Sequence, residues 1–326
     1  MAGLSVSRIG IIGSGVVGSA TGKGLQKLGY DVCFYDILSS KLFSLKQEGY
    51  QVASNIAETI MDSDILFVCV NTPIVNGKVG GYSNKNSSYS SHQDLSQIFS
   101  VLSEISKALG NNRPDKHHLI VFRSTILPGT MRNVIVDYLQ RNCRIRLGED
   151  YDVCYNPEFL RQSSALEDFF KPDRIVIGEG SGGASNPLVE IFKPLTKNII
   201  VTHYEEAEMI KYASNCFLAL KISYFNEIAM ICRTLGIDDK QVSTAVALDK
   251  RIGSYGTLGG MPFGGACFPK DTAAMASFVK KLGLRPDLIE MALELNKEMK
   301  EISSSQQVIK DNRQIDQADV VKFSTQ

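Results

Sequence analysis

Cys267 lies in a segment whose residue types favour a reactive thiol. Residues 263–271 read FGGACFPKD, so two glycines precede the cysteine, and a lysine and an aspartate follow it. The glycines allow the backbone to approach a ligand closely, while Lys270 and the start of a helix favour the thiolate form of a cysteine. A lone cysteine is more often a buried packing residue, so this segment alone leaves both interpretations open.

Two further segments have side chains that suit chemistry at an alcohol or carbonyl oxygen. Lys211 and Asn215 are four residues apart in a helical pattern, so they share one helix face and could bind one oxygen from two sides. Glu158 follows a predicted strand and would lie in a loop at the sheet edge. The alternatives are a charged helix surface for the pair and a solvated carboxylate for the glutamate.

The N-terminal residues contain a dinucleotide-binding pattern. Gly13, Gly15 and Gly18 form GxGxxG between an apolar strand and a helix, and Asp36 ends the next strand. The first glycine permits the turn, the second allows approach of the pyrophosphate, and the third allows close packing of helix and strand. Asp36 would bind the ribose hydroxyls and repel a 2′-phosphate, which predicts NAD. The alternative is a glycine turn with a surface aspartate.

Position along the chain assigns further residues to the cofactor site. Val16 and Val17 begin the helix, whose free amides and positive dipole end suit phosphates. Lys41 could reach the ribose or could be a solvated helix residue. Thr72 and Pro73 follow an apolar strand, and ligands bind at the carboxyl ends of strands in doubly wound sheets.

Apolar runs and helical patterns alternate through about residue 202. Strands are predicted at residues 8–12, 32–35, 65–70, 119–122, 153–155, 175–177 and 199–201. Strands that alternate with helices predict a doubly wound α/β sheet. A long helix without Pro or Gly follows, and the predicted helices lie at residues 205–235, 238–248, 271–282 and 287–303. Residues 76–91 are rich in Gly, Ser, Asn and Tyr, and predict a surface insertion or mobile loop.

Composition and charge narrow the possible partners. The chain has 326 residues, and Lys+Arg and Asp+Glu each number 35, so no net field attracts nucleic acid or anionic lipid. The longest apolar run that we find, Ile65–Val70, is too short to span a bilayer, and the N-terminus lacks the features of a signal peptide. Seven cysteines and four histidines show no metal-ligand spacing. We expect a cytoplasmic protein without bound metal, nucleic acid or membrane.

Several motifs, in this order, resemble those of the UDP-glucose/GDP-mannose dehydrogenase family. They are RST and PGT within residues 123–130, NPEFLR at 156–161, PDRIVIG at 172–178, the lysine–asparagine pair at 211 and 215, and GGxCFxKD at 264–271. The likeness spans about residues 7–300 and is greatest to members that oxidise UDP-glucose. It implies a Rossmann-like NAD-binding domain (residues 1–202), an all-helical central domain (203–302) and a polar tail (303–326).

The resemblance also implies an activity, which is four-electron oxidation of a nucleotide-sugar C6 alcohol to a carboxylate by two NAD, with UDP-glucose and UDP-glucuronate as substrate and product. Cys267 would trap the aldehyde as a thiohemiacetal and then hold a thioester, because an aldehyde cannot expel hydride until a nucleophile adds. Lys211 and Asn215 would stabilise the oxyanion, and Lys211 could also take the alcohol proton. Asp271 and Thr125 would hold water and neighbouring polar groups, and Glu158 would assist hydrolysis.

The remaining site residues follow from the same resemblance. Those expected to contact the sugar, beyond Glu158, Lys211 and Asn215, are Phe159, Leu160, Phe263, Gly264 and Gly265. Thr125 and Lys270 are also expected to contact the cofactor. Arg251 matches an arginine that the family presents to a neighbouring subunit, which implies a homodimer built on the helix at 205–235.

Two departures from the family pattern leave alternatives open. Gln162 stands where many members have a second glutamate, and the family's usual third domain, which closes over the nucleotide, is not found in this sequence. Loss of that binding energy would reduce turnover as well as affinity. The alternatives are a two-electron NAD-dependent 3-hydroxyacid-type dehydrogenase, which needs no cysteine, and a weakly active NAD-binding paralogue that serves as an assembly partner.

Overall fold

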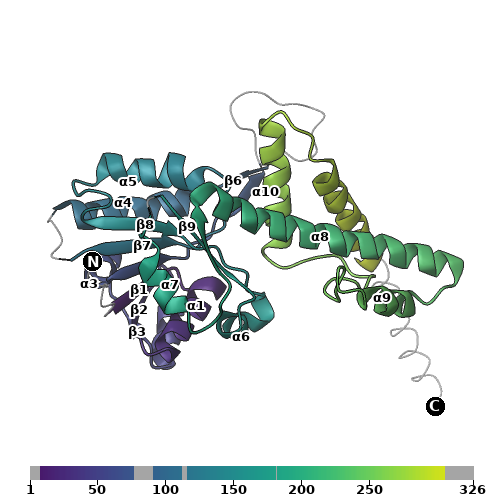
Figure 1. Ribbon diagram of the computed structural model, residues 1–326, viewed down its shortest axis with the longest axis horizontal. Helices are drawn as coiled ribbons and strands as arrows, with labels where there is room; N and C mark the ends of the chain where they lie inside the picture. Colours follow the sequence, from purple (N-terminus) through teal and green to yellow (C-terminus); the bar gives the residue numbers. More distant parts are fainter. Residues whose placement is uncertain (1–7, 77–90, 112–115, 181, 305–326) are drawn as a thin grey trace, which may run out of the picture. The chain divides into compact units, whose positions relative to one another are not determined.

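The computed structural model describes residues 8–76, 91–111, 116–180 and 182–304 (Figure 1). The loop expected at 76–91 and the tail expected from residue 303 lie almost wholly outside these ranges. The chain forms two compact units, one of residues 1–77 and 92–212 and the other of residues 78–91 and 213–326.

The first unit is built on an eight-stranded sheet in the order β10-β9-β8-β7-β4-β1-β2-β3. The strands are β1 (Arg8–Ile12), β2 (Asp31–Tyr35), β3 (Gln51–Val52), β4 (Ile65–Val68), β7 (His118–Phe122), β8 (Tyr151–Tyr155), β9 (Ile175–Glu179) and β10 (Ile199–His203). Neighbouring strands are parallel except β8 and β9, which are antiparallel. The predicted doubly wound sheet is confirmed. The order of the strands reverses at β1, because β2 and β4 lie on opposite sides of that strand. Dinucleotides bind at such a reversal.

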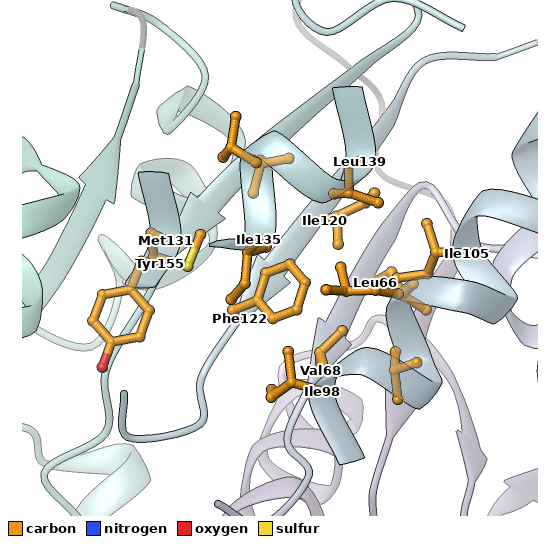
Figure 2. Packing of buried hydrophobic residues seen from close by; sticks show 14 of the residues in the cluster. Leu66, Val68, Ile98, Ile105, Ile120, Phe122, Met131, Ile135, Leu139 and Tyr155 are labelled. Carbon is orange, nitrogen blue, oxygen red and sulfur yellow. The ribbon is translucent and has the colours of Figure 1, made fainter. Parts of the chain in front are cut away.

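Helices cover both faces of this sheet. They are α1 (Val16–Lys27), α2 (Ser39–Gln47), α3 (Ile56–Asp62), α4 (Ser96–Asn111), the π-helix η1 (Met131–Val136), α5 (Asp137–Asn142), the 3₁₀ helix η2 (Gln162–Ser164), α6 (Ala165–Phe170) and α7 (Asn186–Phe192). On one face, α4 and α5 place Ile105 and Leu139 against strand residues such as Ile120 (Figure 2). On the other face, α1 and α6 place Leu25 and Phe169 in a second apolar cluster. Two short strands, β5 (Ile74–Asn76) and β6 (Ser91–Gln93), form a separate sheet.

Helices alone build the described part of the second unit from residue 213 to residue 304. Helix α8 (Tyr204–Leu235) enters it from the first unit, and α9 (Asp239–Ala247), α10 (Phe268–Lys281) and a helix at residues 287–304 follow. The expected helical region after the sheet is confirmed. Helix α10 begins three residues earlier than predicted. Pro269 stands in its first turn, where backbone N–H groups have no partner within the helix, so the proline does not prevent the helix from starting there. No helix in the described ranges has the length and apolar character needed to cross a membrane.

Candidate active site

The glycine-rich turn between β1 and α1 has a geometry that suits phosphate binding. Gly13 has a φ of +89°, and a Cβ there would lie 2.9 Å from a backbone carbonyl oxygen that follows β4. A Cβ on Gly18 would lie 1.8 Å from the Gly13 carbonyl oxygen, so only glycine lets α1 lie this close to the turn. A Cβ on Gly15 would meet nothing within 4 Å. This open space adjoins the first turn of α1, formed by Val16 and Val17, where free amides fit a pyrophosphate.

Asp36 fixes this turn to the end of β2. Its Oδ2 accepts hydrogen bonds from the Ser14 amide at 2.7 Å and the Ser14 hydroxyl at 2.9 Å, and lies 3.3 Å from Lys41 Nζ. Its Oδ1 accepts from the Leu38 amide at 2.9 Å. Burial tends to raise the pKa of Asp36, but the amides of Leu38 and Ser14, the Ser14 hydroxyl and Lys41 outweigh burial and lower it. Asp36 is therefore a carboxylate that both orders the turn and repels a further anion.

A surface hollow of about 230 Å³ adjoins the partners of Asp36. Its lining residues come from the glycine turn, α1 and α2, and are Ser14, Ser19, Lys23, Ser40, Lys41, Ser44, Leu45 and Glu48. Lys23 and Glu48 form an ion pair in this lining. Hydroxyl and ammonium groups surround the hollow, so its chemistry suits the polar ribose end of a dinucleotide.

Thr72 and Thr125 follow neighbouring strands, β4 and β7, at their carboxyl ends. The Thr72 hydroxyl donates to the Thr125 carbonyl oxygen at 2.6 Å, and the Ser124 hydroxyl donates to the Val70 carbonyl oxygen at 2.6 Å. Pro73 is exposed beside them. The loops after β4 and β7 are therefore tied to each other at the edge of the sheet where ligands of this architecture bind.

A buried ion pair joins Glu158 to Lys211. Lys211 Nζ lies 2.9 Å from Glu158 Oε1 and also donates to the Glu158 carbonyl oxygen at 2.5 Å, with side-chain exposures of 3% and 4%. The Leu160 amide donates to Glu158 Oε2 at 2.7 Å. Burial tends to raise the pKa of Glu158, but Lys211, the Leu160 amide and Arg123 outweigh it and lower that pKa. The loop after β8 is therefore held to the beginning of α8.

Two cations lie close to the Phe159 ring. The Arg174 guanidinium carbon is 4.0 Å from the ring centroid, and Lys211 Nζ is 5.3 Å from it. A ring face attracts a positive charge in this geometry. Phe159 therefore supports the position of the Lys211 ammonium from a second direction.

Glu208, one turn before Lys211 on α8, holds the loop that precedes η1. Its two carboxyl oxygens accept from the Gly129 amide at 2.6 Å and the Met131 amide at 2.7 Å. The side chain is fully buried. Burial, with a smaller contribution from Glu205, raises the pKa of Glu208 to about 7, although the two amides and Arg132 oppose this change.

In the second unit, Asn215 and Lys270 converge on Asp271. Asn215 Nδ2 donates to Asp271 Oδ2 at 2.7 Å, and Lys270 Nζ lies 2.5 Å from Asp271 Oδ1. Asp271 is fully buried and Asn215 is 6% exposed. Lys270, expected to contact the cofactor, forms its described ion pair with this aspartate.

Cys267 is the N-cap residue of α10 and is half-buried. Its carbonyl oxygen accepts from the Asp271 amide at 2.8 Å, which places both residues in the first turn of the helix. Phe263 is buried, and its ring packs edge-on against Phe268 with centroids 6.5 Å apart. A Cβ on Gly264 would meet nothing within 4 Å, so the backbone is open before the cysteine.

Two other residues of this unit bear on the expected roles. Arg251 has a side chain 88% exposed and forms an ion pair with Asp249 at 2.6 Å. Cys216 is a second thiol in the same region, and burial raises its pKa to about 12, with a further contribution from Asp271. Cys216 is therefore protonated at neutral pH.

Within each unit the structure brings several expected residues together, and it adds partners that sequence analysis missed. The first unit groups the glycine turn with Asp36 and Lys41, Thr72 with Thr125, and Glu158, Phe159 and Leu160 with Lys211; the second groups Asn215, Lys270, Asp271 and Cys267. The missed partners are Ser14, Gln93, Glu208 and Tyr212. Ser14 stands inside the glycine motif and Glu208 one turn before Lys211, so spacing could have indicated both. Across the described ranges no group of three or more His, Cys, Asp or Glu residues is placed to hold a metal ion.

Comparison with known protein families matches both units. Residues 44–196 match the NAD binding domain of the UDP-glucose/GDP-mannose dehydrogenase family, and residues 205–298 match its central domain. Residues 1–77 also match the NAD binding domain of D-isomer specific 2-hydroxyacid dehydrogenases. All three matches concern dehydrogenases, and two of them concern one family.

Individual proteins show the same similarity. The chain is 34% identical to UDP-glucose 6-dehydrogenase AglM of Haloferax volcanii over 312 residues, covering 88% of this chain and 69% of that protein. It is 33% identical to GDP-mannose 6-dehydrogenase of Pseudomonas putida over 312 residues, covering 89% and 68%. The solved structure of a UDP-glucose dehydrogenase from Pyrobaculum islandicum has a TM-score of 0.77 and 33% identity, covering 91% of this chain and 69% of that one.

We expect Asp36→Ala to weaken NADH binding roughly tenfold or more, because hydrogen bonds to a charged group contribute about 1.5–3 kcal/mol. The affinity ratio of NADPH to NADH should rise in the same variant. Fluorescence titration with both nucleotides measures this. Asp36→Asn is the matched control: its single carbonyl oxygen can accept from the Ser14 amide or the Leu38 amide but not from both, so it should raise the ratio with a smaller loss of affinity than Asp36→Ala. An unchanged ratio in both variants would remove Asp36 from the site.

We also expect the free energy of unfolding to fall as pH rises and Glu208 loses its proton. Its folded pKa of about 7 exceeds the ordinary value of 4.5, so the folded state binds more protons between these values. Its contribution to stability is therefore fully present below pH 4.5 and lost as pH rises through 7. Between pH 4.5 and 8, wild-type stability relative to Glu208→Gln should fall by up to about 3 kcal/mol in urea titrations. Glu190→Gln, at an exposed glutamate on α7, is the control. If the difference in unfolding free energy between the wild type and Glu208→Gln does not change with pH, the prediction is contradicted.

Proposed function

Since this chain belongs to the UDP-glucose/GDP-mannose dehydrogenase family, we propose that it oxidises the C6 alcohol of UDP-glucose to the carboxylate of UDP-glucuronate. Members of the family are NAD-dependent nucleotide-sugar dehydrogenases, and NAD is the cofactor of this chain. The Haloferax and Pyrobaculum proteins support UDP-glucose as the substrate, whereas the Pseudomonas protein is named for GDP-mannose. Two supporting proteins against one favour UDP-glucose, and turnover of each nucleotide sugar tests this choice.

The first oxidation depends on an oxygen site. When bound, NAD accepts a hydride from the carbon that is oxidised. The Lys211 ammonium, paired with Glu158, and the Asn215 amide stabilise negative charge on the oxygen of that carbon. The alcohol proton passes to water held by Asp271 and Thr125. The product of this step is the aldehyde.

The second oxidation needs Cys267. Its thiolate adds to the aldehyde carbon, so a C–S bond forms and the carbonyl oxygen becomes an oxyanion held by Lys211 and Asn215. Loss of a second hydride leaves a thioester. Water then attacks the thioester with help from Glu158, the C–S bond breaks, and the thiol and a carboxylate are released. The balance is two hydrides removed, one water consumed and three protons released.

One observation carries this proposal: Cys267 stands at the N-terminus of α10, in the turn that also holds the buried Asp271. A helix N-terminus favours a thiolate. The Asn215–Asp271 hydrogen bond ties this turn to the part of α8 that belongs to the second unit. A simple alcohol dehydrogenase has no use for such a thiol, so the cysteine supports four-electron over two-electron chemistry.

We expect two NADH for each UDP-glucose consumed by the wild-type protein, and no carboxylate from Cys267→Ser. The variant should still bind NADH, because only the covalent step is lost. The measurement is a spectrophotometric count of NADH, with UDP-glucose, GDP-mannose and UDP-N-acetylhexosamines offered in turn, and product identified by mass spectrometry.

Cys143→Ser is the matched control for that experiment. Its hydroxyl can replace the thiol that contacts Ser106 at 3.5 Å, at the end of α5, so turnover should stay within about twofold. Normal turnover by Cys267→Ser would refute the covalent route, and one NADH per substrate would favour the two-electron alternative. Faster turnover of GDP-mannose would reassign the substrate.

We further propose that the protein is a cytoplasmic homodimer. Phe217, Tyr224 and Ile231 recur every seven residues along α8 and are 62%, 54% and 49% exposed, so they form an apolar stripe on one helix face. Such a stripe is typical of a protein interface. The seven cysteines form no disulfide in the described structure, as expected in a reducing compartment.

Substitution in that stripe should separate the subunits. We expect Phe217→Glu with Tyr224→Glu to halve the mass measured by light scattering at micromolar concentration, because two charges cannot be buried unpaired. Lys240→Glu, an exposed charge change on α9, is the control and should leave the mass unchanged. A wild-type monomer at the same concentration would contradict the dimer.

A further inference from the structure

Gln93, the last residue of β6, connects three segments of the first unit through its side-chain amide. Its Nε2 donates to the Thr125 carbonyl oxygen at 2.6 Å and to the Tyr212 hydroxyl at 3.3 Å. Its Oε1 accepts from the Leu127 amide at 3.2 Å. The segments that it joins are β6, the loop after β7 and the third turn of α8.

The two bonds to the loop need a primary amide. A primary amide presents N–H donors and a carbonyl acceptor in one fixed plane, so it pairs with the Thr125 carbonyl and the Leu127 amide as a neighbouring strand would, with a second N–H left for Tyr212. A carboxylate in its place would set an oxygen against the Thr125 carbonyl, and an apolar side chain would leave both backbone groups without this partner. The Gln93 side chain therefore acts as a short substitute for backbone pairing.

The third bond extends this restraint to α8. Tyr212 is fully buried and directly follows Lys211, so its hydroxyl fixes the helix turn that carries the ammonium. Glu208 holds the same loop farther along, at Gly129 and Met131. Two side chains therefore connect the loop after β7 to α8, and Gln93 is the one nearer to Thr125.

We propose that Gln93 is a positioning residue, which sets the separation between Thr125 and the Lys211 turn of α8. The inference rests on the proposed function, in which Thr125 holds water and Lys211 stabilises the oxyanion. A displacement of about 1 Å in such a constellation can reduce the rate about 100-fold without altering binding of the rest of the substrate. In the described part of the chain, Gln93 acts through Thr125, Leu127 and Tyr212.

The test compares Gln93→Ala with Gln93→Met, which keeps the length of the side chain but forms none of the three bonds. We expect kcat with UDP-glucose to fall roughly 10-fold or more in both variants, with KM for NAD changed less than about twofold. Gln51→Ala is the matched control, since the Gln51 amide donates to Asp31 at 3.0 Å on the far edge of the sheet. Its kcat should stay within about twofold of wild type.

A double-mutant cycle separates positioning from a general loss of stability. We expect Tyr212→Phe to lower kcat less than Gln93→Ala does. The double variant should be faster than the product of the two single effects predicts, because both single variants lose the same bond between Gln93 and Tyr212. Thermal unfolding of all variants is measured alongside. Multiplicative effects in the cycle, or a loss of kcat that simply follows the melting temperature, would overturn the positioning role.

Two failures are distinguishable in this design. An active wild-type enzyme whose Gln93→Ala and Gln93→Met variants keep kcat within twofold would overturn the inference about Gln93 and leave the proposed function intact. A wild-type protein that reduces no NAD with any nucleotide sugar would overturn the proposed function, and with it the positioning role.

Discussion

The ion pair between Lys211 and Glu158 is the constraint on which the first unit's candidate site depends. Burying either ion alone costs several kcal/mol, so each needs a full set of partners. The Glu158 carbonyl oxygen and the Leu160 amide complete that set. The loop after β8 and the start of α8 must therefore fold together, since removing either partner leaves an uncompensated charge.

The second unit solves the same problem with different groups. Asp271 is fully buried, and a lysine and an amide, Lys270 and Asn215, neutralise and hydrogen-bond it. An amide beside a buried carboxylate adds a hydrogen bond without a second buried ion. Cys267 lies in the same helical turn, so the arrangement that stabilises the aspartate also fixes the backbone of the thiol residue.

Sequence patterns predicted the features that short stretches of chain determine. The glycine turn, the β2 aspartate and the long helix α8 all depend on neighbours within about 35 residues. The strand β3 was missed because its two residues, Gln51 and Val52, are too few to show a period. The antiparallel direction of β9 was not predictable because apolar runs look alike in both directions. The Gln93–Tyr212 bond spans 119 residues and the Glu208–Gly129 bond spans 79, so only the folded chain reveals them.

These long-range bonds attach the N-terminal part of α8 to three segments of the first unit. Glu208, Lys211 and Tyr212 lie within five residues of one another on α8. They reach the loop after β7, the loop after β8 and, through Gln93, strand β6. Loops at the carboxyl ends of parallel strands have few backbone partners of their own, because the ladder ends before them. A helix that supplies a carboxylate, an ammonium and a hydroxyl satisfies those groups together, and makes a rigid platform from segments that would otherwise move independently.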